Sequence, residues 1–488
     1  MGSAQRIDQH LRQGVVGFPT ALATAVGVVM ASPVILTVST GFSLGGGVFV
    51  AAMAIAFIMM LAQASTFAEA ATMLPTSGSV YDYIACGSGR FLAITGTLSA
   101  YILVHVFAGT AETILSGVMA TVNFEVMHQV LVDHNATWAV GVGLVVLFAL
   151  LNCFGVTAFG RVEVVLTFGM WITLMVFGIM GVLSAPRVQL QGWFGVSAIG
   201  ADFETVASFI GMAMFMFLGL EFVTPLAPDL KNAQRTIPRA MFLGLCLVAL
   251  CMTLWGTAMV RQVANVALDP KGLVHILETP DAVPLLANRL MGPFGKVWIG
   301  IAFLLTGAAT INTLMASLPR IMYGMALDGA LPKAFAYLHP RFRSPLVGIA
   351  VAAVIPVAHA VWIHGDLDRI MPLVLAAVCS WGVAYLLVNI SVVLLRLRRP
   401  DLPRAYRSPW FPLPQLVSSV GIVLAIWYIT PPGMEPSSIY VPFGVMLGLT
   451  AVYALVWTVF VQKVNPFTPV PVEEVLEAEF GRHTVAAH

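Results

Sequence analysis

An acidic residue ends a long apolar stretch of this sequence. Residues 208–220 read SFIGMAMFMFLGL, and Glu221 follows directly, with Pro225 and Pro228 shortly after it. Proline breaks the helical hydrogen-bond ladder, and irregular backbone at membrane depth survives only where it is buried in protein or lines a cavity. An acid at that depth marks a functional site by default. The stretch therefore predicts an interrupted helix with Glu221 at or beside a site.

A second group of polar residues shares one helical face. Tyr101, His105, Ala108 and Glu112 follow one another at helical spacing. A histidine and an acid two turns apart on a membrane helix are costly unless they face water, a partner or a substrate. Three interpretations stay open: these side chains line a cavity, they form a polar contact between scaffold helices, or they face lipid. Together with Glu221, His105 and Glu112 are the candidates for carrying a coupling proton.

The composition places these residues in a membrane. Of the 488 residues, 59% are hydrophobic and 10% are charged, whereas soluble proteins carry about 25% charged residues. Apolar runs of about 20 residues, enough to span a bilayer as a helix, recur along the chain. The net charge of +1 gives no reason to expect a nucleic acid partner, and the five cysteines lack metal-ligand spacing. We expect neither a metal nor another cofactor.

The apolar runs predict twelve membrane-spanning helices between two terminal segments, residues 1–17 and 463–488. The C-terminal segment is expected to be disordered. The predicted spans are residues 18–40, 44–70, 91–121, 136–156, 162–185, 204–226, 239–260, 294–322, 346–363, 370–396, 411–430 and 439–462.

Basic residues are distributed unevenly between the two ends of these spans. With the N-terminus inside, 18 of the 24 Lys and Arg residues lie on the cytoplasmic side. The positive-inside rule therefore predicts that both termini are cytoplasmic. We expect a multi-pass protein of the cell membrane, with the lipid bilayer as its surroundings.

The first predicted span is interrupted as well. Residues 23–41 read ATAVGVVMASPVILTVSTG, with Gly27 and Pro33 in mid-span. Spans one and six are thus the two broken ones, and an offset of five inverts the second copy relative to the first. This pattern indicates an inverted-repeat secondary transporter with its substrate at the midplane, between the broken helices. Two ordinary proline-kinked helices are the alternative.

Four stretches resemble the amino acid–polyamine–organocation transporter superfamily, in the family's order and across nearly the whole chain. They are FAEAATMLPTSGSVYDYI (67–84), FLGLE (217–221) with KNAQRTIPRA (231–240), PRIMYGMALDGALPKAF (319–335) and RAYRSPWFPLPQL (404–416). The resemblance implies an all-α integral membrane fold of twelve helices. Residues 18–185 and 204–396 would form two inverted repeats of five helices, and residues 411–462 two peripheral helices. Alternating access would proceed around a central site.

The resemblance assigns the substrate site to the two breaks. The half-helix after the first break presents free N–H groups and a positive dipole end, which suit a carboxylate. Of the family's Gly-Ser-Gly only Ser32 is kept, and Pro33 lacks an N–H. The unwound part of span six offers carbonyl groups to an ammonium, while Glu221 either carries a proton or holds this region as a structural acid. The residues expected to bind substrate are Met30, Ala31, Ser32, Pro33, Tyr101, His105, Phe215, Phe217, Leu218, Gly219, Glu221 and Thr310.

The driving force stays open at this stage. Proton-coupled members of the superfamily often carry a lysine in span five, and the alignment from Arg161 places Met170 there. Because methionine carries no charge, coupling through a span-five lysine is not expected. Exchange against a counter-substrate, or proton coupling through Glu221, Glu112 or His105, are the remaining mechanisms.

Four acids near predicted span ends are expected to fix gates or loops. Pairing with Arg90, Arg235 or Arg320 is expected. The external stretch 263–295 resembles the outer lid loop of the fold, with a plain linker as the alternative. The four acids are Glu69, Asp82, Asp229 and Asp328.

The sequence thus predicts a secondary active transporter for an amino acid. A polyamine or an amino alcohol is the alternative cargo, favoured by the weakened carboxylate cradle and by the acids of spans three and six. A channel or a transporter-like sensor is a further alternative. An enzyme is not expected, because the sequence contains no HExxH motif, nucleophile elbow or CxxC pair.

Overall fold

The computed structural model describes residues 11–134, 136–184, 202–263, 277, 279–363, 369–431 and 433–481. These residues are helical or lie in connections between helices. Their one β-type pairing is an isolated bridge between Val16 and Leu230. The all-α expectation is confirmed for this part of the chain.

The N-terminal part of the chain contains a mixture of long and short helices. One of its runs changes type three times, from α-helix to a π-helix (η1), then to a 3-10 helix (η2), and back to α-helix. The elements are α1 (Phe18–Gly27), α2 (Ser32–Met73), α3 (Val80–Ser88), α4 (Arg90–Thr97), η1 (Leu98–Ile102), η2 (Leu103–Val106), α5 (Ala108–Asn123), α6 (Glu125–Val132), α7 (Ala139–Cys153) and α8 (Val156–Ser184).

The C-terminal part begins with the second run expected to be broken, α9 followed by a 3-10 helix (η4). The elements are α9 (Phe203–Phe215), η4 (Leu220–Asp229), α10 (Ala233–Val263), α12 (Ala282–Leu327), η7 (Lys333–Ala336), α13 (Leu346–Trp362), α14 (Ile370–Arg398), α15 (Leu413–Trp427), α16 (Ser437–Val456), η9 (Trp457–Gln462) and α17 (Val472–Phe480).

Eight helical runs within the described residues are long and apolar enough to cross a bilayer, and four further apolar helices are shorter. Two of the eight are bent at a glycine: α2 at Gly46 (φ 50°) and α12 at Gly292 (φ 63°). Positive φ strains residues that carry a Cβ, so glycine is favoured at both bends. The bend at Gly46 lies two residues inside the predicted span two (44–70), so the change of direction comes slightly later than the predicted boundary between spans one and two. The total of twelve crossings and the inverted repeat stay predictions.

Two segments expected to be irregular contain helix. The tail after residue 462 is not disordered throughout, because α17 forms there and buries Val472, Val475 and Glu479. Their spacing of three and four residues puts them on one face, so packing holds the short helix. In the stretch 263–295, which was expected to be external, α12 already begins at Ala282, while residues 264–276 and 278 lie outside the described residues.

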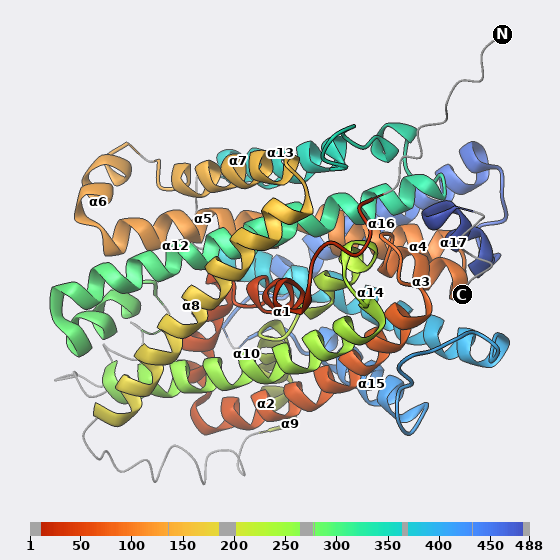
Figure 1. The fold of residues 1–488 in the computed structure, drawn as a ribbon. Coiled ribbons are helices and arrows are strands. Elements are labelled where there is room, and N and C mark those ends of the chain that lie inside the picture. Colours follow the sequence, from red (N-terminus) through yellow and green to blue (C-terminus); the bar gives the residue numbers. More distant parts are fainter. Residues whose placement is uncertain are drawn as a thin grey trace.

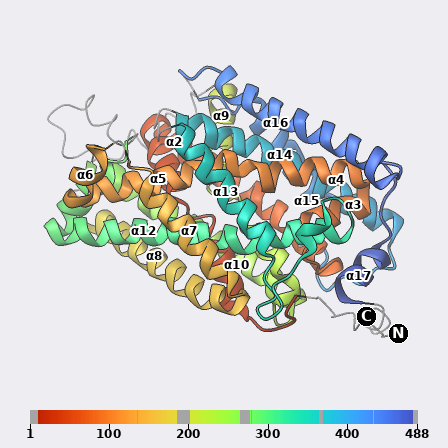
Figure 2. The same cartoon turned by 90° about the horizontal axis from the view of Figure 1, so that it is seen from above.

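Helix α1 lies at the centre of the molecule, surrounded by longer helices. It packs against α8, α10, α12 and η4, and its residues from Thr20 to Gly27 are buried. Figure 1 shows α1 among these helices, with α6 near one end of the molecule and α17 near the other. Helix α16 lies at the edge (Figure 2) and exposes Val441, Val445 and Leu449. Such an apolar outer face suits contact with lipid.

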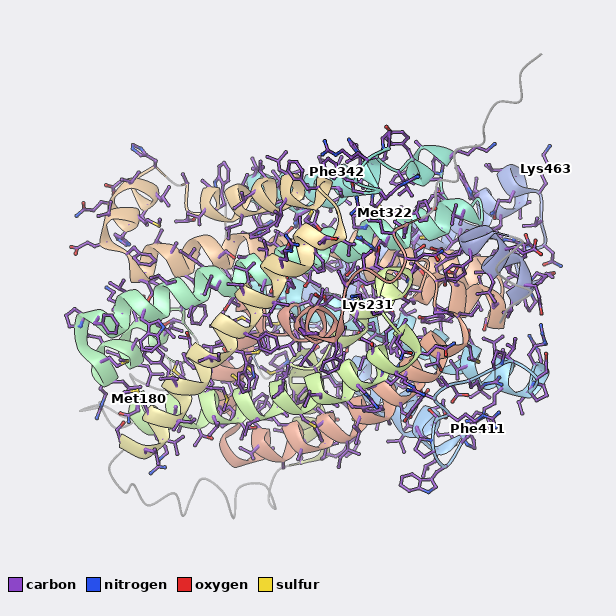
Figure 3. All side chains as sticks on the ribbon, in the orientation of Figure 1. Met180, Lys231, Met322, Phe342, Phe411 and Lys463 are labelled. Atoms are coloured by element: carbon purple, nitrogen blue, oxygen red, sulfur yellow. The ribbon has the colours of Figure 1, made fainter. Side chains whose placement is uncertain are left out.

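The two described ends of the chain lie at the same end of the molecule. Leu11 packs against Tyr323 near the end of α12. The Ser77 hydroxyl, just before α3, donates to the Glu479 carboxylate of α17 (2.6 Å). Lys463 lies near this end and Met180 near the opposite one (Figure 3). An even number of crossings has this consequence, whichever side of the membrane this end faces.

Two of the four acids predicted to fix span ends have the expected basic partners. The Asp328 carboxylate accepts from the Arg90 guanidinium (2.7 and 2.9 Å) and also from the Tyr81 hydroxyl. The Asp229 carboxylate at the end of η4 accepts from Arg320 of α12 (2.7 Å), and both side chains are buried. Buried pairs of this kind hold their helices together, because separating them leaves an uncompensated charge.

The other two acids have partners that the sequence reasoning did not name. Glu69 of α2 lies 3.3 Å from both Arg396 and Arg404. Asp82 of α3 accepts a hydrogen bond from the Thr76 hydroxyl (2.5 Å). The Glu69 contacts connect α2 to the end of α14 and the connection that follows it.

The docked face of α17 brings two carboxyl groups close to each other. Burial raises the pKa of Glu479 to about 7, and the hydrogen bond from Ser77 opposes this only in part. Burial also raises the pKa of Asp82 to about 8, with the Glu479 charge as a further contribution. Both groups therefore bind a proton more readily in the docked state than in an undocked one. Docking is favoured at low pH and is weakened as the pH rises through 7 to 8.

We predict that α17 detaches more often at high pH. Hydrogen–deuterium exchange of residues 472–480, corrected for intrinsic exchange rates, should be faster at pH 8.5 than at pH 6. Glu479→Gln should reduce this difference, because it removes one of the two titrating groups. Glu473→Gln is the control: Glu473 lies on the same helix but is exposed beside Arg399. Equal exchange of the wild-type segment at both pH values would contradict the prediction.

Candidate functional site

The first membrane helix is interrupted where α1 ends at Gly27 and α2 begins at Ser32. The residues between them are not helical, and Ala31 has extended backbone (ψ 153°). Pro33 lies in the first turn of α2, where its missing N–H removes no helical hydrogen bond. The Thr310 hydroxyl of α12 donates to the Gly27 carbonyl (3.2 Å), one of the acceptors that the break leaves open. The interruption begins slightly earlier than the expected Met30.

The start of α2 is in contact with a carboxylate of the protein itself. Glu112 of α5 accepts hydrogen bonds from the backbone amide of Ser32 (2.9 Å) and from its hydroxyl (2.8 Å). The Ser116 hydroxyl donates a third hydrogen bond to the same carboxylate (3.1 Å). A negative charge beside a helix N-terminus is stabilised by the unpaired amides and the helix dipole. Glu112 therefore caps the half-helix at which a substrate carboxylate was expected.

The second interruption lies between α9 and η4. Helix α9 ends at Phe215, and Gly219 has φ 111°, in the left-handed region that glycine adopts without strain. The segment after it forms a 3-10 helix that contains Pro225 and Pro228. Proline supplies no N–H to the ladder, which explains why the α-helix does not resume here.

Glu221 holds this second interruption in place. Its carboxylate accepts from the hydroxyls of Tyr101 (2.9 Å) and Tyr385 (2.6 Å) and from the backbone amide of Gly219 (3.2 Å). The three donors come from different parts of the chain. Tyr101 belongs to η1, Tyr385 belongs to α14, and Gly219 lies in the break itself. Of the two interpretations of Glu221, the geometry favours the structural one.

The helix run of residues 90–123 is irregular where it passes the two breaks. Tyr101 belongs to the π-helix η1, and His105 belongs to the 3-10 helix η2. Such interruptions of α-helices often occur at functional sites. Gly109 makes room for the histidine, because a Cβ atom there would lie 2.1 Å from His105 Nδ1. The irregular turns present Tyr101 and His105 to the same space as Glu112.

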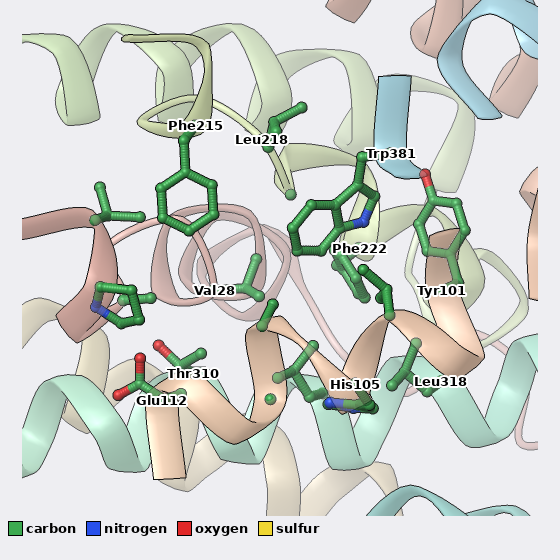
Figure 4. Close-up of a pocket in the computed structure, with 18 residues that line it drawn as sticks. Val28, Tyr101, His105, Glu112, Phe215, Leu218, Phe222, Thr310, Leu318 and Trp381 are labelled. Carbon is green, nitrogen blue, oxygen red and sulfur yellow. The ribbon is translucent and has the colours of Figure 1, made fainter. Parts of the chain in front are cut away.

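A cavity lies between the two breaks, with aromatic and aliphatic walls and a few polar groups (Figure 4). Its volume of about 40 Å³ is room for about three water molecules. Only the smallest solutes fit without movement of the walls. Most of the lining side chains are buried. The lining residues are Val28, Ala31, Pro33, Val34, Tyr101, Val104, His105, Ala108, Gly109, Glu112, Phe215, Leu218, Gly219, Phe222, Thr310, Leu314, Leu318 and Trp381.

Most of the residues expected at the site line this cavity, and four of them do not. Ser32 is turned toward Glu112, and Glu221 toward its two tyrosines. The Phe217 ring packs edge-on against Phe57 of α2 (centroids 5.9 Å apart). The residues that line the cavity as expected are Ala31, Pro33, Tyr101, His105, Glu112, Phe215, Leu218, Gly219 and Thr310, and those that do not are Met30, Ser32, Phe217 and Glu221.

The sequence analysis assigned no site role to Tyr385, Phe222 or Trp381. Trp381 lines the cavity, with its ring 6.5 Å from that of Phe215. Tyr385 lies one helical turn further along α14. No motif identifies these residues, because their roles depend on α14 packing beside the second break. An aromatic repeat at helical spacing in span ten was the available signal.

A third buried acid, Glu163 of α8, lies against the first break. It accepts hydrogen bonds from Thr167 (2.8 Å), Asn312 (2.7 Å) and Thr313 (3.0 Å). A Cβ atom on Gly27 would lie 2.3 Å from the Glu163 carboxylate. Span five therefore presents an acid, Glu163, to the break. The sequence analysis had looked for a charged residue at the position of Met170 instead. An acid near the start of an apolar run was the signal in the sequence.

We predict that the tyrosine hydroxyls stabilise the second break. Tyr385→Phe removes a hydrogen bond to a buried carboxylate, a loss of about 1–3 kcal/mol, and Tyr101→Phe should have a similar effect. Each should lower the apparent melting temperature of the purified protein by several degrees. Tyr337→Phe is the control, because Tyr337 is exposed outside the bundle. A melting temperature of Tyr385→Phe equal to that of the control would exclude this role.

Comparison with known proteins places the chain in a family. Residues 16–452 match the amino acid permease family. The chain is 23% identical to the branched-chain amino acid permease BcaP of Bacillus subtilis, over 86% of this chain and 88% of that relative. It is 22% identical to the methylthioribose transporter of Bacillus subtilis, over 88% of this chain and 91% of that relative.

A solved structure shares the fold. It is a Na⁺-coupled sialic acid symporter in a substrate-bound outward-open state, with a TM-score of 0.56 and 13% identity over 88% of this chain and 93% of that one. At this identity the likeness concerns the fold alone. The match over nearly the whole chain, together with the helical fold, shows that this protein is a membrane transporter of the amino acid permease family.

Proposed function

We propose that this protein is a secondary active transporter that moves an amino-group-bearing solute by alternating access. The observation that supports the proposal most directly is that both helix breaks face one small buried cavity. Interrupted helices at membrane depth present backbone groups to a solute, and rigid-body movement around that point opens the site to either side. The two candidate cargoes are an amino acid, which the sequence favours, and an organic amine.

The site supports the second candidate, and the comparisons do not restrict the cargo to amino acids. One relative is named for amino acids and another for methylthioribose, so membership of the family does not require an amino acid cargo. Glu112 at the start of α2 also gives the cavity a negative group of its own. Both cargo classes share an ammonium group, for which this carboxylate is a suitable partner.

The proposed movement separates two groups of helices that are in contact here. Spans one, two, six and seven would move as a bundle against spans three, four, eight and nine, within two inverted repeats at residues 18–185 and 204–396. The Asp229–Arg320 pair connects η4 of the bundle to α12 of the scaffold. The Ser317 hydroxyl of α12 also donates to the Phe222 carbonyl (2.7 Å). These contacts would hold one end of the path closed.

The charge distribution supports a sidedness for this arrangement. Arg90, Arg320 and Arg396 lie at the end of the molecule where the two described chain ends meet. The positive-inside rule makes this end the cytoplasmic one. We place the protein in the cell membrane with this end inside.

Glu112 and His105 are better placed than Glu221 to carry a coupling proton. Glu112 and His105 line it, so a solute or a water molecule can reach them. Glu221 has its donors within the protein. A coupling proton would therefore use Glu112 or His105, and exchange against a counter-substrate needs neither.

The transport proposal predicts solute counterflow. Proteoliposomes loaded with an unlabelled amino acid or amine should accumulate the labelled form of the same solute, and the rate should saturate with concentration. Saturation follows because each transport cycle binds solute at one small site. Vesicles with protein inactivated by heating serve as the control. A flux that rises linearly with concentration, or a current without exchange, would instead indicate a channel.

The gate proposal predicts that Asp229→Asn opens the cytoplasmic end. Loss of the carboxylate leaves Arg320 buried without its counter-charge, a change of roughly 3–5 kcal/mol against the closed arrangement. A cysteine introduced as Leu318→Cys on the cavity wall should then react several-fold faster with a membrane-impermeant thiol reagent added at the cytoplasmic side. Asp401→Asn is the control, because the Asp401–Arg399 pair at the same end is largely exposed and contributes little. Equal rates in the two variants would refute the gate.

A further inference from the structure

We propose that the site takes a small organic amine without a carboxylate, because Glu112 already fills the position that the carboxylate of an amino acid would need. The inference rests on the proposed transport function and narrows its cargo from amino-group-bearing solutes in general to amines whose second polar group is uncharged, of the amino alcohol type. It is carried by the hydrogen bonds at the start of α2, by the charge of the cavity wall, and by two buried ring nitrogens.

The backbone amides at the start of α2 have acceptors within the protein. The Ser32 amide donates to Glu112, and the amides of Val34 and Ile35 both donate to the Ala31 carbonyl (3.0 and 3.2 Å). Pro33 has no amide hydrogen. The Ser32 hydroxyl, the one side-chain donor in this turn, is also directed to Glu112. An incoming carboxylate would therefore have to displace Glu112 before it could use this helix start.

The charge of the cavity wall favours a cation over a second anion. Glu112 is the only acid among the residues that line the cavity, and none of those residues is Lys or Arg. A carboxylate brought beside Glu112 would meet a like charge at short range. A carboxylate has about four lone-pair positions, of which three accept hydrogen bonds from Ser32 and Ser116. No donor among the described residues uses the remaining position, so an ammonium that reaches it would leave the other three hydrogen bonds in place.

The rest of the cavity wall provides aromatic faces and two polar atoms. The rings of Phe215 and Trp381 are neighbours, as are those of Tyr101 and Phe222 (centroids 5.4 Å apart), and aromatic faces attract cations. Trp381 Nε1 and His105 Nε2 are buried and have no hydrogen-bond partner among the described residues. An indole N–H can only donate, so its partner must carry an acceptor. The hydroxyl oxygen of an amino alcohol is an uncharged acceptor for the N–H of Trp381.

The test compares ligands that differ only at the carboxyl group. Purified full-length protein is titrated with alanine and alaninol, with leucine and leucinol, and with ethylamine and isoamylamine, and its melting temperature is followed. A ligand that binds the folded state raises this temperature by mass action. Each amino alcohol should bind at least 10-fold more tightly than the matching amino acid, and the simple amine should fall between them. Counterflow in proteoliposomes with the same ligands should give the same order.

Two variants separate the role of the charge from a folding defect. Glu112→Gln keeps an acceptor for Ser32 but removes the charge, so amine affinity should fall at least 10-fold. Glu112→Ala frees the Ser32 amide and hydroxyl, so leucine or alanine should gain affinity relative to its amino alcohol. This gain cannot come from misfolding. Glu125→Gln, at an exposed acid on α6, is the control and should behave as the wild type.

The outcomes distinguish this inference from the transport proposal. Saturable counterflow in which the amino acids bind more tightly than their amino alcohols would overturn the inference and leave the transport proposal intact. Unchanged preference in Glu112→Ala would overturn the assignment of selectivity to Glu112. Neither binding nor counterflow with any solute of the panel would overturn both.

Discussion

The structure depends on one constraint: a helix that stops inside a bilayer leaves backbone amides and carbonyls that lipid cannot satisfy. Two such interruptions lie in the described part of the chain, and each is met by a buried glutamate. Glu112 accepts from the amide that opens α2, and Glu221 accepts from the amide of Gly219. Hydroxyl groups of Ser32, Tyr101 and Tyr385 complete both contacts. These acids make the breaks stable features of the fold.

Both interruptions are tied to the same helix run, residues 90–123. Tyr101 contacts the second break through Glu221, and Glu112, further along the run, contacts the first. The π-helical and 3-10 turns lie in this part of the run, where the regular hydrogen-bond ladder is weakest. A change at one break therefore has a direct physical route to the other. A transporter that must couple two moving halves around one solute can use such a route.

The polar groups of the centre are divided between support and recognition. Glu163 with its three donors and Glu221 with its tyrosines are enclosed by protein and serve the backbone. Glu112 belongs to both classes, because it caps α2 and also lines the cavity. Solute binding at Glu112 would thus act directly on the contact between α5 and α2. This contact joins a proposed scaffold helix to a proposed moving one, so recognition and movement share a single side chain.

Local patterns were sufficient for much of the fold and for part of the site. Composition and apolar run length identified a helical membrane protein, and the prolines after Glu221 and at residue 33 identified the two breaks, because proline acts on its own helix whatever surrounds it. Helical spacing placed Tyr101, His105 and Glu112 on one face. The expectation of a disordered C-terminal tail was wrong for residues 472–480, since the burial of Val472 and Val475 depends on contacts with distant segments that no local pattern contains.

The sequence by itself determined the class of protein, the positions of the breaks and the acids available to them. Only the tertiary structure decided which acid serves which purpose. Glu221 could carry a proton or hold a break until Tyr385, 164 residues away, was seen beside it. The start of α2 was the expected place for a substrate carboxylate, and only the structure shows that Glu112, 80 residues away, is hydrogen-bonded to its first amide. Hydrogen bonds between distant segments depend on how helices pack, and residue type and spacing alone do not specify that packing.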